Sequence, residues 1–280
     1  MKRLKNWALT LGIAGSLMLG VASPRAAVAL SEAEVMSRLT SVPVFTLVDD
    51  KGNPIVGSVK DAQQKDQPVL LFFLNHKDAL EQLSTYQKAK PADAEKAGIR
   101  LLSMKEVLES YEKIKDKSKV IYSIEPNASE LQTAVSLLKN NGQLVVKDGK
   151  LLTKDGNAFV PDVPLFFPTI KGPDGKPRFL PLTVQKEVQG KKQTDAFIPF
   201  YLNKGDLDSD IQELIKDNSK QNVQVQVLMF NTFLSHLYNA KAAKDVPFRI
   251  IPSDESSKFV NSLLQQAAQK NKQAPAPKTN

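Results

Sequence analysis

Polar and apolar residues follow two different periods along this chain. Val69–Leu74 and Ala196–Leu202 are nearly continuous apolar runs, as expected for strands buried on both faces. Val223, Val225 and Val227 alternate with polar residues, which predicts a strand with one polar face. Helical spacing is found at about 78–87 and 208–216, within Val107–Ile114 and Phe233–Leu237, and within Leu131–Leu138 and Val260–Ala267. Alternating strands and helices favour a layered α/β fold.

The same order of elements occurs twice in the chain. The segment Val42–Phe45 (VPVF) recurs as Val163–Phe166 (VPLF), and a Gly/Pro turn follows each copy. Later in the two copies the offset is constant at 126 residues, so that Leu138 corresponds to Leu264. The fold is therefore predicted to consist of two repeated α/β units of about 125 residues, each able to bury its own core. We expect a pseudo-twofold axis between them.

The repeat also predicts the domain boundaries. The first unit is expected at residues 30–142 and the second at 163–265. Residues 143–162 contain two Asp-Gly turns and are predicted to form a hairpin between the units. Residues 266–280 are polar and contain APAP, so we expect a disordered tail.

The amino terminus has the features of a secretory leader. Basic residues precede the apolar run Trp7–Ala22, and Ala27-Val28-Ala29 resembles a cleavage site. We expect cleavage after Ala29; a retained anchor is the alternative, but the run is shorter than the ~20 residues of a typical span. No later segment reaches that length. Removal of the leader lowers the formal charge from +8 to +4, so no nucleic-acid partner is expected.

Few residues in the chain indicate catalysis. There is no cysteine, and the two histidines are His76 and His236. The sequence has no recognisable nucleophile, zinc or nucleotide motif, so we expect neither enzymatic activity nor a metal or cofactor. A Leu-Asn-x-x-Asp corner occurs at Leu74–Asp78 and at Leu202–Asp206. It could hold a ligand, but helix capping by the Asn explains the pattern without one.

The apolar residues are the more informative candidates. Aromatic residues concentrate in the second half, and most must belong to a core. Those at strand ends or in a cleft between the units could instead bind apolar peptide segments, because Met and aromatic side chains suit adaptable contacts. The candidate client-binding residues are Phe230, Phe233, Met229, Phe200 and Phe72.

Taken together, the exported leader, VPVFTLVDDKGNPIV, QPVLLFFLN, VPLFFPT and DAFIPFYLN resemble the Tic22-like family. Its plastid members are soluble intermembrane-space components of the chloroplast import translocon, and the bacterial leader here resembles that of an exported cyanobacterial member. The resemblance implies a duplicated α/β fold with apolar pockets, chaperone-like handling of precursor proteins and a role in outer-membrane biogenesis. It supplies no catalytic residue.

The leading hypothesis is thus a non-enzymatic, chaperone-like factor in the periplasm or the thylakoid lumen. Its expected partners are unfolded or precursor proteins and, further, outer-membrane or envelope translocon components. Two alternatives stay open at this stage. One is an enzyme with an unrecognised site at the Leu-Asn-x-x-Asp corners, and the other is a passive scaffold that docks on a translocon without holding clients.

Overall fold

The structure is a computed structural model that describes residues 32–60, 63–91, 96–116, 119–188, 191–217, 222–239 and 247–273. The predicted leader, residues 1–29, lies outside this range. Two compact units are present, and each combines two separate segments of the chain. One unit consists of Thr40–Asn127 and the chain from Pro252 onward, and the other of the chain up to Leu39 with Ala128–Ile251. We call them the N-sheet unit and the C-sheet unit.

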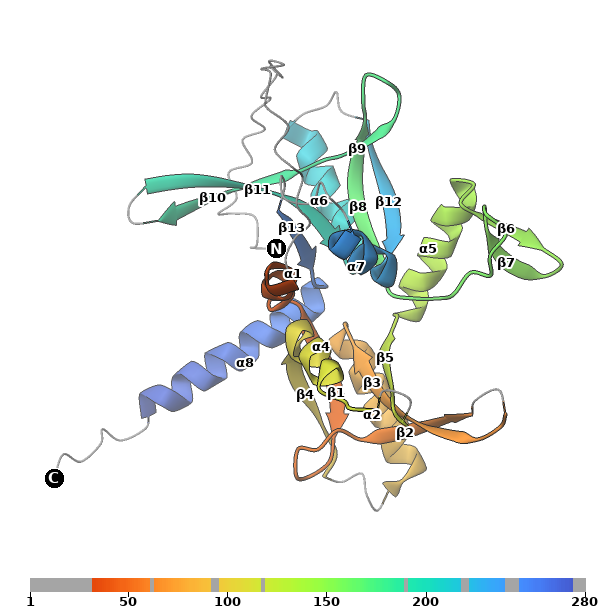
Figure 1. The fold of residues 1–280 in the computed structure, drawn as a ribbon. Coiled ribbons are helices and arrows are strands. Elements are labelled where there is room, and N and C mark those ends of the chain that lie inside the picture. The colour runs from red at the N-terminus through yellow and green to blue at the C-terminus, as the bar shows by residue number, and fades with distance from the viewer. Residues whose placement is uncertain are drawn as a thin grey trace. The chain divides into compact units, whose positions relative to one another are not determined.

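The N-sheet unit contains a five-stranded sheet (Figure 1). Its strands are β1 (Pro43–Val48), β2 (Val56–Lys60), β3 (Asp66–Phe73), β4 (Gly98–Ser103) and β5 (Ile121–Glu125). The order is β2-β3-β1-β4, and β5 pairs in parallel with β3. The helices of this unit are α2 (His76–Ala89), α4 (Met104–Glu112) and α8 (Asp254–Gln273).

The C-sheet unit contains a six-stranded sheet and a separate hairpin. The sheet comprises β8 (Pro164–Lys171), β9 (Pro177–Phe179), β10 (Leu182–Val188), β11 (Lys191–Tyr201), β12 (Val223–Met229) and β13 (Phe248–Ile251). The hairpin is β6 (Leu144–Lys147) with β7 (Lys150–Thr153), and the helices are α1 (Glu32–Leu39), α5 (Ala128–Asn140), α6 (Lys204–Asp217) and α7 (Phe230–Asn239). The strand order is β10-β11-β8-β12, with β13 parallel to β11 and β9 on β8. The mixed α/β fold predicted from the sequence is confirmed.

The two sheets have the same strand order, apart from the extra β9. In both units a backbone hydrogen bond to the residue before the first strand of the sheet holds the first residue of a helix. The Val42 carbonyl accepts a hydrogen bond from the Met104 N–H at the start of α4 (2.9 Å), and the Val163 carbonyl accepts one from the Phe230 N–H at the start of α7 (2.8 Å). These equivalences agree with the motif VPVF/VPLF, whereas a duplication and its twofold axis stay predictions.

The last helix of each half of the sequence packs in the unit of the other half. Helix α5 follows the N-sheet strands in sequence but contacts β6, β8 and β12, and α8 follows the C-sheet strands but contacts α2. The compact units therefore do not follow the predicted boundaries, 30–142 and 163–265, which assumed that consecutive elements pack together. The amphipathic pattern of a helix shows that it has a buried face but does not show which sheet that face covers.

In each unit two helices cover one face of the sheet. In the N-sheet unit Phe45 and Phe73 pack with α2 and with Phe259 of α8. In the C-sheet unit Phe166 and Tyr201 pack with residues of α5 and α6, among them Leu138 and Leu207. The opposite faces, reached by α4 and α7, carry the aromatic residues described below.

Three details of the predicted elements need correction. Helices α2 and α6 begin at His76 and Lys204, directly after the Leu-Asn pairs and before the predicted starts at 78 and 208. Strand β10 and the first part of β11 form a long antiparallel ribbon. Its sequence is strongly polar and lacks the apolar pattern that predicts a strand. Helix α8 continues to Gln273, so the tail predicted from residue 266 is helical over its first part.

Candidate functional site

A connected group of phenylalanine rings lies on the α7 side of the C-sheet. Tyr201 pairs with Phe166 and lies on the opposite face with it, so the preceding residue, Phe200, lies on this face. Phe248 lies on this face too, because it is two residues before the partner of Phe200 in β13. Ring centroids are 4.6 Å apart for Phe200 and Phe233 and 5.0 Å apart for Phe233 and Phe248. Spacings of this size are typical of favourable aromatic contacts. The core end of the group is rigidly packed.

The group continues outward to exposed rings at the other end. The Phe167 ring lies 5.3 Å from that of Phe200 and 5.2 Å from that of Phe179 on β9. Phe167 is half-buried and Phe179 is 49% exposed. The exposed ring of Phe179 thus rests on a buried aromatic support. We call Phe167, Phe179, Phe200, Phe230, Phe233 and Phe248 the phenylalanine cluster.

The equivalent face of the N-sheet has a smaller aromatic group. Phe72 of β3 lies 5.1 Å from Tyr122 of β5, and Tyr122 lies 5.3 Å from Tyr111 of α4 (centroid to centroid). The Ser110 hydroxyl donates to the Tyr122 hydroxyl (3.4 Å). Both tyrosines are half-buried. This face is aromatic in its interior but presents hydroxyl groups at its margin.

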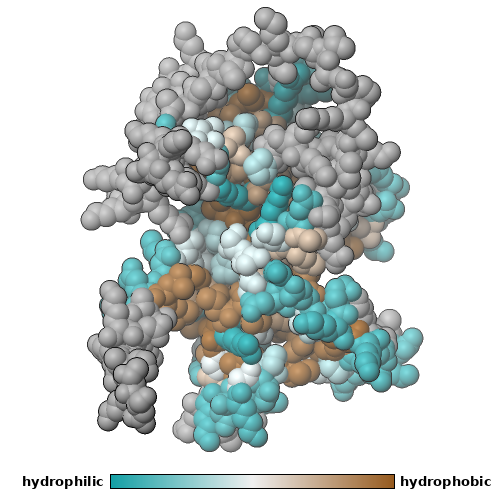
Figure 2. All heavy atoms as spheres, turned by 60° about the vertical axis from the view of Figure 1, so that its left-hand side comes forward, coloured by the Kyte–Doolittle hydropathy of each residue, from teal (hydrophilic) through white to brown (hydrophobic). Residues whose placement is uncertain are grey.

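Other exposed apolar side chains belong to both units. Figure 2 shows apolar side chains gathered in a brown band across the unit that contains β1–β5. Among the large apolar residues that the structure describes, those with substantial exposure in this unit are Val56, Val59, Leu80, Ile121 and Leu264. In the C-sheet unit they are Val145, Val146, Val160 and Phe179. Phe179 is thus the aromatic member of these exposed sets.

Four of the five predicted client-binding residues are core residues. Phe230, Phe233, Phe200 and Phe72 are all less than 5% exposed, and Met229 is half-buried. Buried rings offer no surface to a partner in this conformation; two of them belong to α7 itself and pack inward. Their role in client binding stays a prediction; what the structure adds is that Phe200 and Phe233 support the exposed ring of Phe179. The sequence had not singled out Phe179, since it lies in a Gly/Pro-rich hairpin of polar character.

The Leu-Asn-x-x-Asp corners begin helices, as the capping interpretation predicted. The Asn75 side-chain oxygen accepts from the Lys77 N–H (3.1 Å) at the start of α2. The Asn203 oxygen likewise accepts from the Asp206 N–H (2.9 Å) at the start of α6. Among the residues that the structure describes, no group of His, Asp or Glu side chains could hold a metal ion.

Each corner is also bound by the helix exchanged from the other half of the sequence. At α6, one oxygen of Glu130 accepts from the Asn203 amide (2.8 Å) and the other from the Lys204 N–H (3.0 Å). At α2, the Ser256 hydroxyl accepts from the His76 N–H (3.0 Å). Glu130 and Ser256 are 126 residues apart. The same position in α5 and α8 thus fastens each exchanged helix to a corner.

Burial changes the titration of the groups at these corners. Desolvation raises the pKa of the Glu130 carboxyl, partly opposed by the hydrogen bond from Lys204. Desolvation also raises the pKa of Asp78, which accepts a hydrogen bond from the Asn127 amide (2.8 Å). These groups hold local structure, and nothing in their arrangement aligns a nucleophile with a base.

The two histidines have different surroundings. The His76 ring stacks on Phe259, with centroids 3.5 Å apart, and contacts the edge of Phe45. Burial lowers its pKa, and the charge of Glu255 partly opposes this change. His236 is exposed on α7, where its Nδ1 lies 2.8 Å from the Thr232 carbonyl oxygen. His76 is therefore a core residue, and His236 a surface residue.

The comparisons with known proteins now assign the chain to a class. A sequence model of the Tic22-like family matches residues 16–262, so the chain belongs to the Tic22-like family. The solved structure of Anabaena Tic22, described as a protein-transport protein, is similar with a TM-score of 0.60 and 20% identity over 83% of this chain and 97% of that one. Tic22 from Plasmodium falciparum is similar with a TM-score of 0.56 and 17% identity, covering 83% and 98%. None of the curated proteins matches this chain.

Proposed function

We propose that this protein is a non-enzymatic, chaperone-like factor that holds apolar segments of precursor proteins during their transport. The observation that carries the proposal is the phenylalanine cluster, which extends from fully buried rings to the exposed ring of Phe179. Contiguous exposed apolar surface marks interaction sites on soluble proteins, and the half-buried ring of Phe167 extends the exposed surface of Phe179. Membership of a family with a protein-transport relative supports the same class of function.

The physical advantage of the cluster is that its exposed ring is already in position. Phe179 contacts Phe167 and Phe200, with centroids 5.2 and 6.1 Å away. Because Phe200 is itself packed by Phe233, binding an apolar side chain requires little further ordering of the protein. Dispersion and burial of apolar area suffice for such contacts, so many different sequences can bind.

The site of action that we propose is outside the cytoplasm, in the periplasm or the thylakoid lumen, after removal of the leader. Outer-membrane or envelope translocon components are the expected docking partners, as the family suggests. Within the described residues, no helix is both long and apolar enough to cross a membrane.

Suppression of aggregation by an unfolded model protein tests the proposal. The wild-type protein should suppress it without nucleotide, and Phe179→Ser should abolish most of this activity while leaving the melting temperature nearly unchanged. Leu264→Ser is a matched control, because Leu264 is exposed on α8 and lies outside the phenylalanine cluster. A passive scaffold would fail to suppress aggregation even as wild type, and full activity of Phe179→Ser would refute the proposed surface.

A further inference from the structure

The β6–β7 hairpin is a two-stranded sheet that pairs with neither of the larger sheets. Its base is well anchored. Leu144 is buried in the α5–α6 core, and the Phe159 N–H donates to the Leu151 carbonyl (2.9 Å). Its tip is a tight turn in which Asp148 and Gly149 both have positive φ, 51° and 71°, as a type I′ turn requires. The hairpin thus presents a defined tip on a fixed base.

Both faces of this hairpin carry exposed apolar side chains. Val145 and Val146 are 46% and 61% exposed, and adjacent residues in a strand point to opposite faces. A hairpin that lay against the protein would bury one of the two valines. Their joint exposure indicates a projecting tip rather than the wall of a groove.

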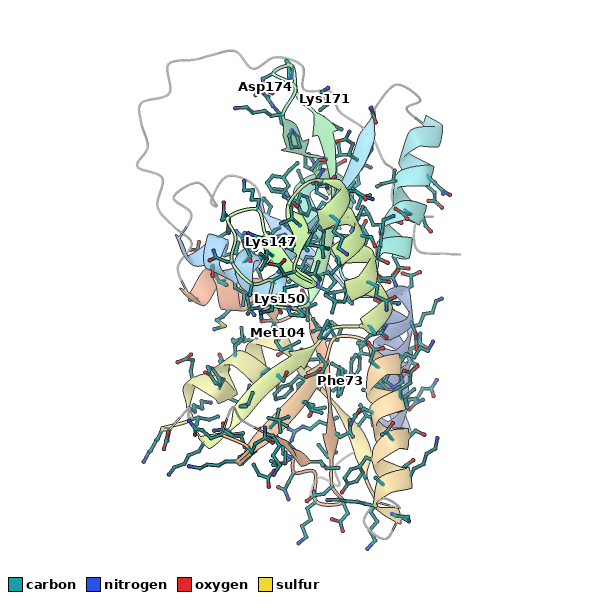
Figure 3. The ribbon with its side chains drawn as sticks, turned by 90° about the vertical axis from the view of Figure 1, so that its right-hand side faces the viewer. Phe73, Met104, Lys147, Lys150, Lys171 and Asp174 are labelled. Carbon is teal, nitrogen blue, oxygen red and sulfur yellow. The ribbon has the colours of Figure 1, made fainter. Side chains whose placement is uncertain are left out.

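The same tip carries two lysines directly opposite each other. Lys147 pairs with Lys150 across the strands, and both are exposed on the hairpin (Figure 3). Like charges at opposed positions destabilise a strand pair. Within the described part of the chain neither ammonium group forms an ion pair, with Asp148 or with any other acid. An anionic partner would relieve this repulsion.

The tip of the β8–β9 hairpin differs from that of β6–β7 in the way its charge is compensated. At its tip Asp174 lies 3.7 Å from Arg178 in an ion pair and accepts a hydrogen bond from the Lys176 N–H (3.3 Å). Lys171 and Asp174 are both seen there in Figure 3. The basic charge at that tip is thus partly compensated by the protein itself.

From these observations we infer that the tip of the β6–β7 hairpin docks the protein on an anionic lipid surface. Lys147 and Lys150 contact acidic headgroups, and Val145 and Val146 enter the interfacial layer on either side of the strand. Cations beside apolar side chains suit this interface. The anionic headgroups attract the basic residues, and the apolar side chains enter the layer below them. A projecting tip with apolar residues on both faces suits a layer of lipid, which can embed both faces at once, whereas an extended peptide would add along one strand edge.

Vesicle flotation tests this inference with the mature protein, whose N terminus is first determined by sequencing. The vesicles contain phosphatidylcholine alone or with phosphatidylglycerol. Wild type should bind only the anionic vesicles, and high salt should weaken the binding. Lys147→Gln/Lys150→Gln should lower the partition coefficient about 30-fold, since each lysine near an anionic surface contributes about fivefold. Lys171→Gln/Lys176→Gln, with the same change in charge, should bind nearly as wild type.

Three results would overturn the inference. The first is a wild type with no preference for anionic vesicles. The second is equal loss of binding in both double variants, which would indicate only an effect of net charge. The third is a hairpin variant that binds vesicles normally but fails to suppress client aggregation, which would make the hairpin a protein-binding element. Because aggregation assays need no lipid, a failure here is distinguishable from a failure of the proposed holding function. Far-UV circular dichroism of each variant checks that it is folded.

Discussion

The N-sheet and C-sheet units share a strand order but differ in the aromatic face that each presents. The C-sheet face holds a cluster composed entirely of phenylalanine, which reaches the surface at Phe179. The N-sheet face holds Phe72 with two tyrosines, and a serine hydroxyl contacts one of them. The topology of a sheet thus constrains where aromatic rings lie, whereas the chemistry of the side chains at the exposed margin can differ between the two units. The proposed holding of clients is therefore expected mainly in the C-sheet unit.

Phe200 and Phe72 lie on equivalent strands and test whether the two aromatic interiors are equally important for stability. Each ring is buried, so Phe200→Ala and Phe72→Ala should each lower the free energy of unfolding by about 3–5 kcal/mol. Urea denaturation monitored by circular dichroism measures the two values. If Phe72→Ala were nearly neutral, the N-sheet face would be loosely packed, and the equivalence of the two interiors would be wrong.

The attachment of the exchanged helices gives the next largest expected effect. Ser256→Ala removes the acceptor of the His76 N–H, and Glu130→Ala removes the acceptor of the Lys204 N–H. Leaving such an N–H without its acceptor costs about 1–2 kcal/mol, so both variants should be destabilised by that amount in the same urea assay. Ser262→Ala on the exposed side of α8 is a control and should change stability little. A neutral Glu130→Ala would show that α5 is held by its apolar face alone.

The pH dependence of stability should differ between the corners because only the N-sheet corner contains a histidine. Burial lowers the pKa of His76 below its ordinary value of 6.5, so the unfolded chain binds a proton more readily than the folded one. Stability should be unaffected by His76 above pH ~6.5 and should fall as the pH drops below that value toward the folded pKa. Asp78 and Glu130 act in the opposite sense at more acidic pH, since burial raises their pKa values.

Urea denaturation between about pH 5 and 7 measures this effect. His76→Gln should flatten the dependence on pH. A wild type whose stability is constant over this interval would contradict the burial argument for His76.

Much of the fold was accessible from the sequence because its elements are marked by local signals. The apolar run Val69–Leu74 and the Asn75 cap correctly predicted a strand followed by a helix, although α2 begins two residues before the predicted start. The exchange of α5 and α8 was not predictable in the same way. It depends on which sheet an amphipathic helix covers. For α5 this is determined by contacts such as those of Glu130 with residues 73 and 74 positions later in the chain, which no local pattern predicts.

The candidate site was the least accessible part. Phe230 and Phe233 are apolar, and that same character buries them on the inward side of α7. Phe179 has a weaker local signal, because prolines, glycines and basic residues surround it. Only the pairing of Thr169 with Phe179 places its ring beside Phe167.

The smallest expected effect on stability belongs to the exposed end of the phenylalanine cluster. Phe179→Ser should change the free energy of unfolding by less than about 1 kcal/mol, as surface substitutions usually do. Phe200→Ala is the comparison, because the buried ring of Phe200 supports the exposed ring of Phe179. Phe200→Ala should lose holding together with stability, whereas Phe179→Ser should lose holding alone. A large loss of stability in Phe179→Ser would show that the ring has a structural role.

Site-specific photocrosslinking tests the central claim most directly. A photoreactive phenylalanine analogue is placed at position 179 and, in a matched variant, at position 264 on α8, which is at least as exposed. With an unfolded precursor present, the account predicts strong crosslinks from position 179 and few from position 264. Equal labelling at both positions, or none at position 179 while aggregation is still suppressed, would contradict the claim that the C-sheet phenylalanine cluster holds the client.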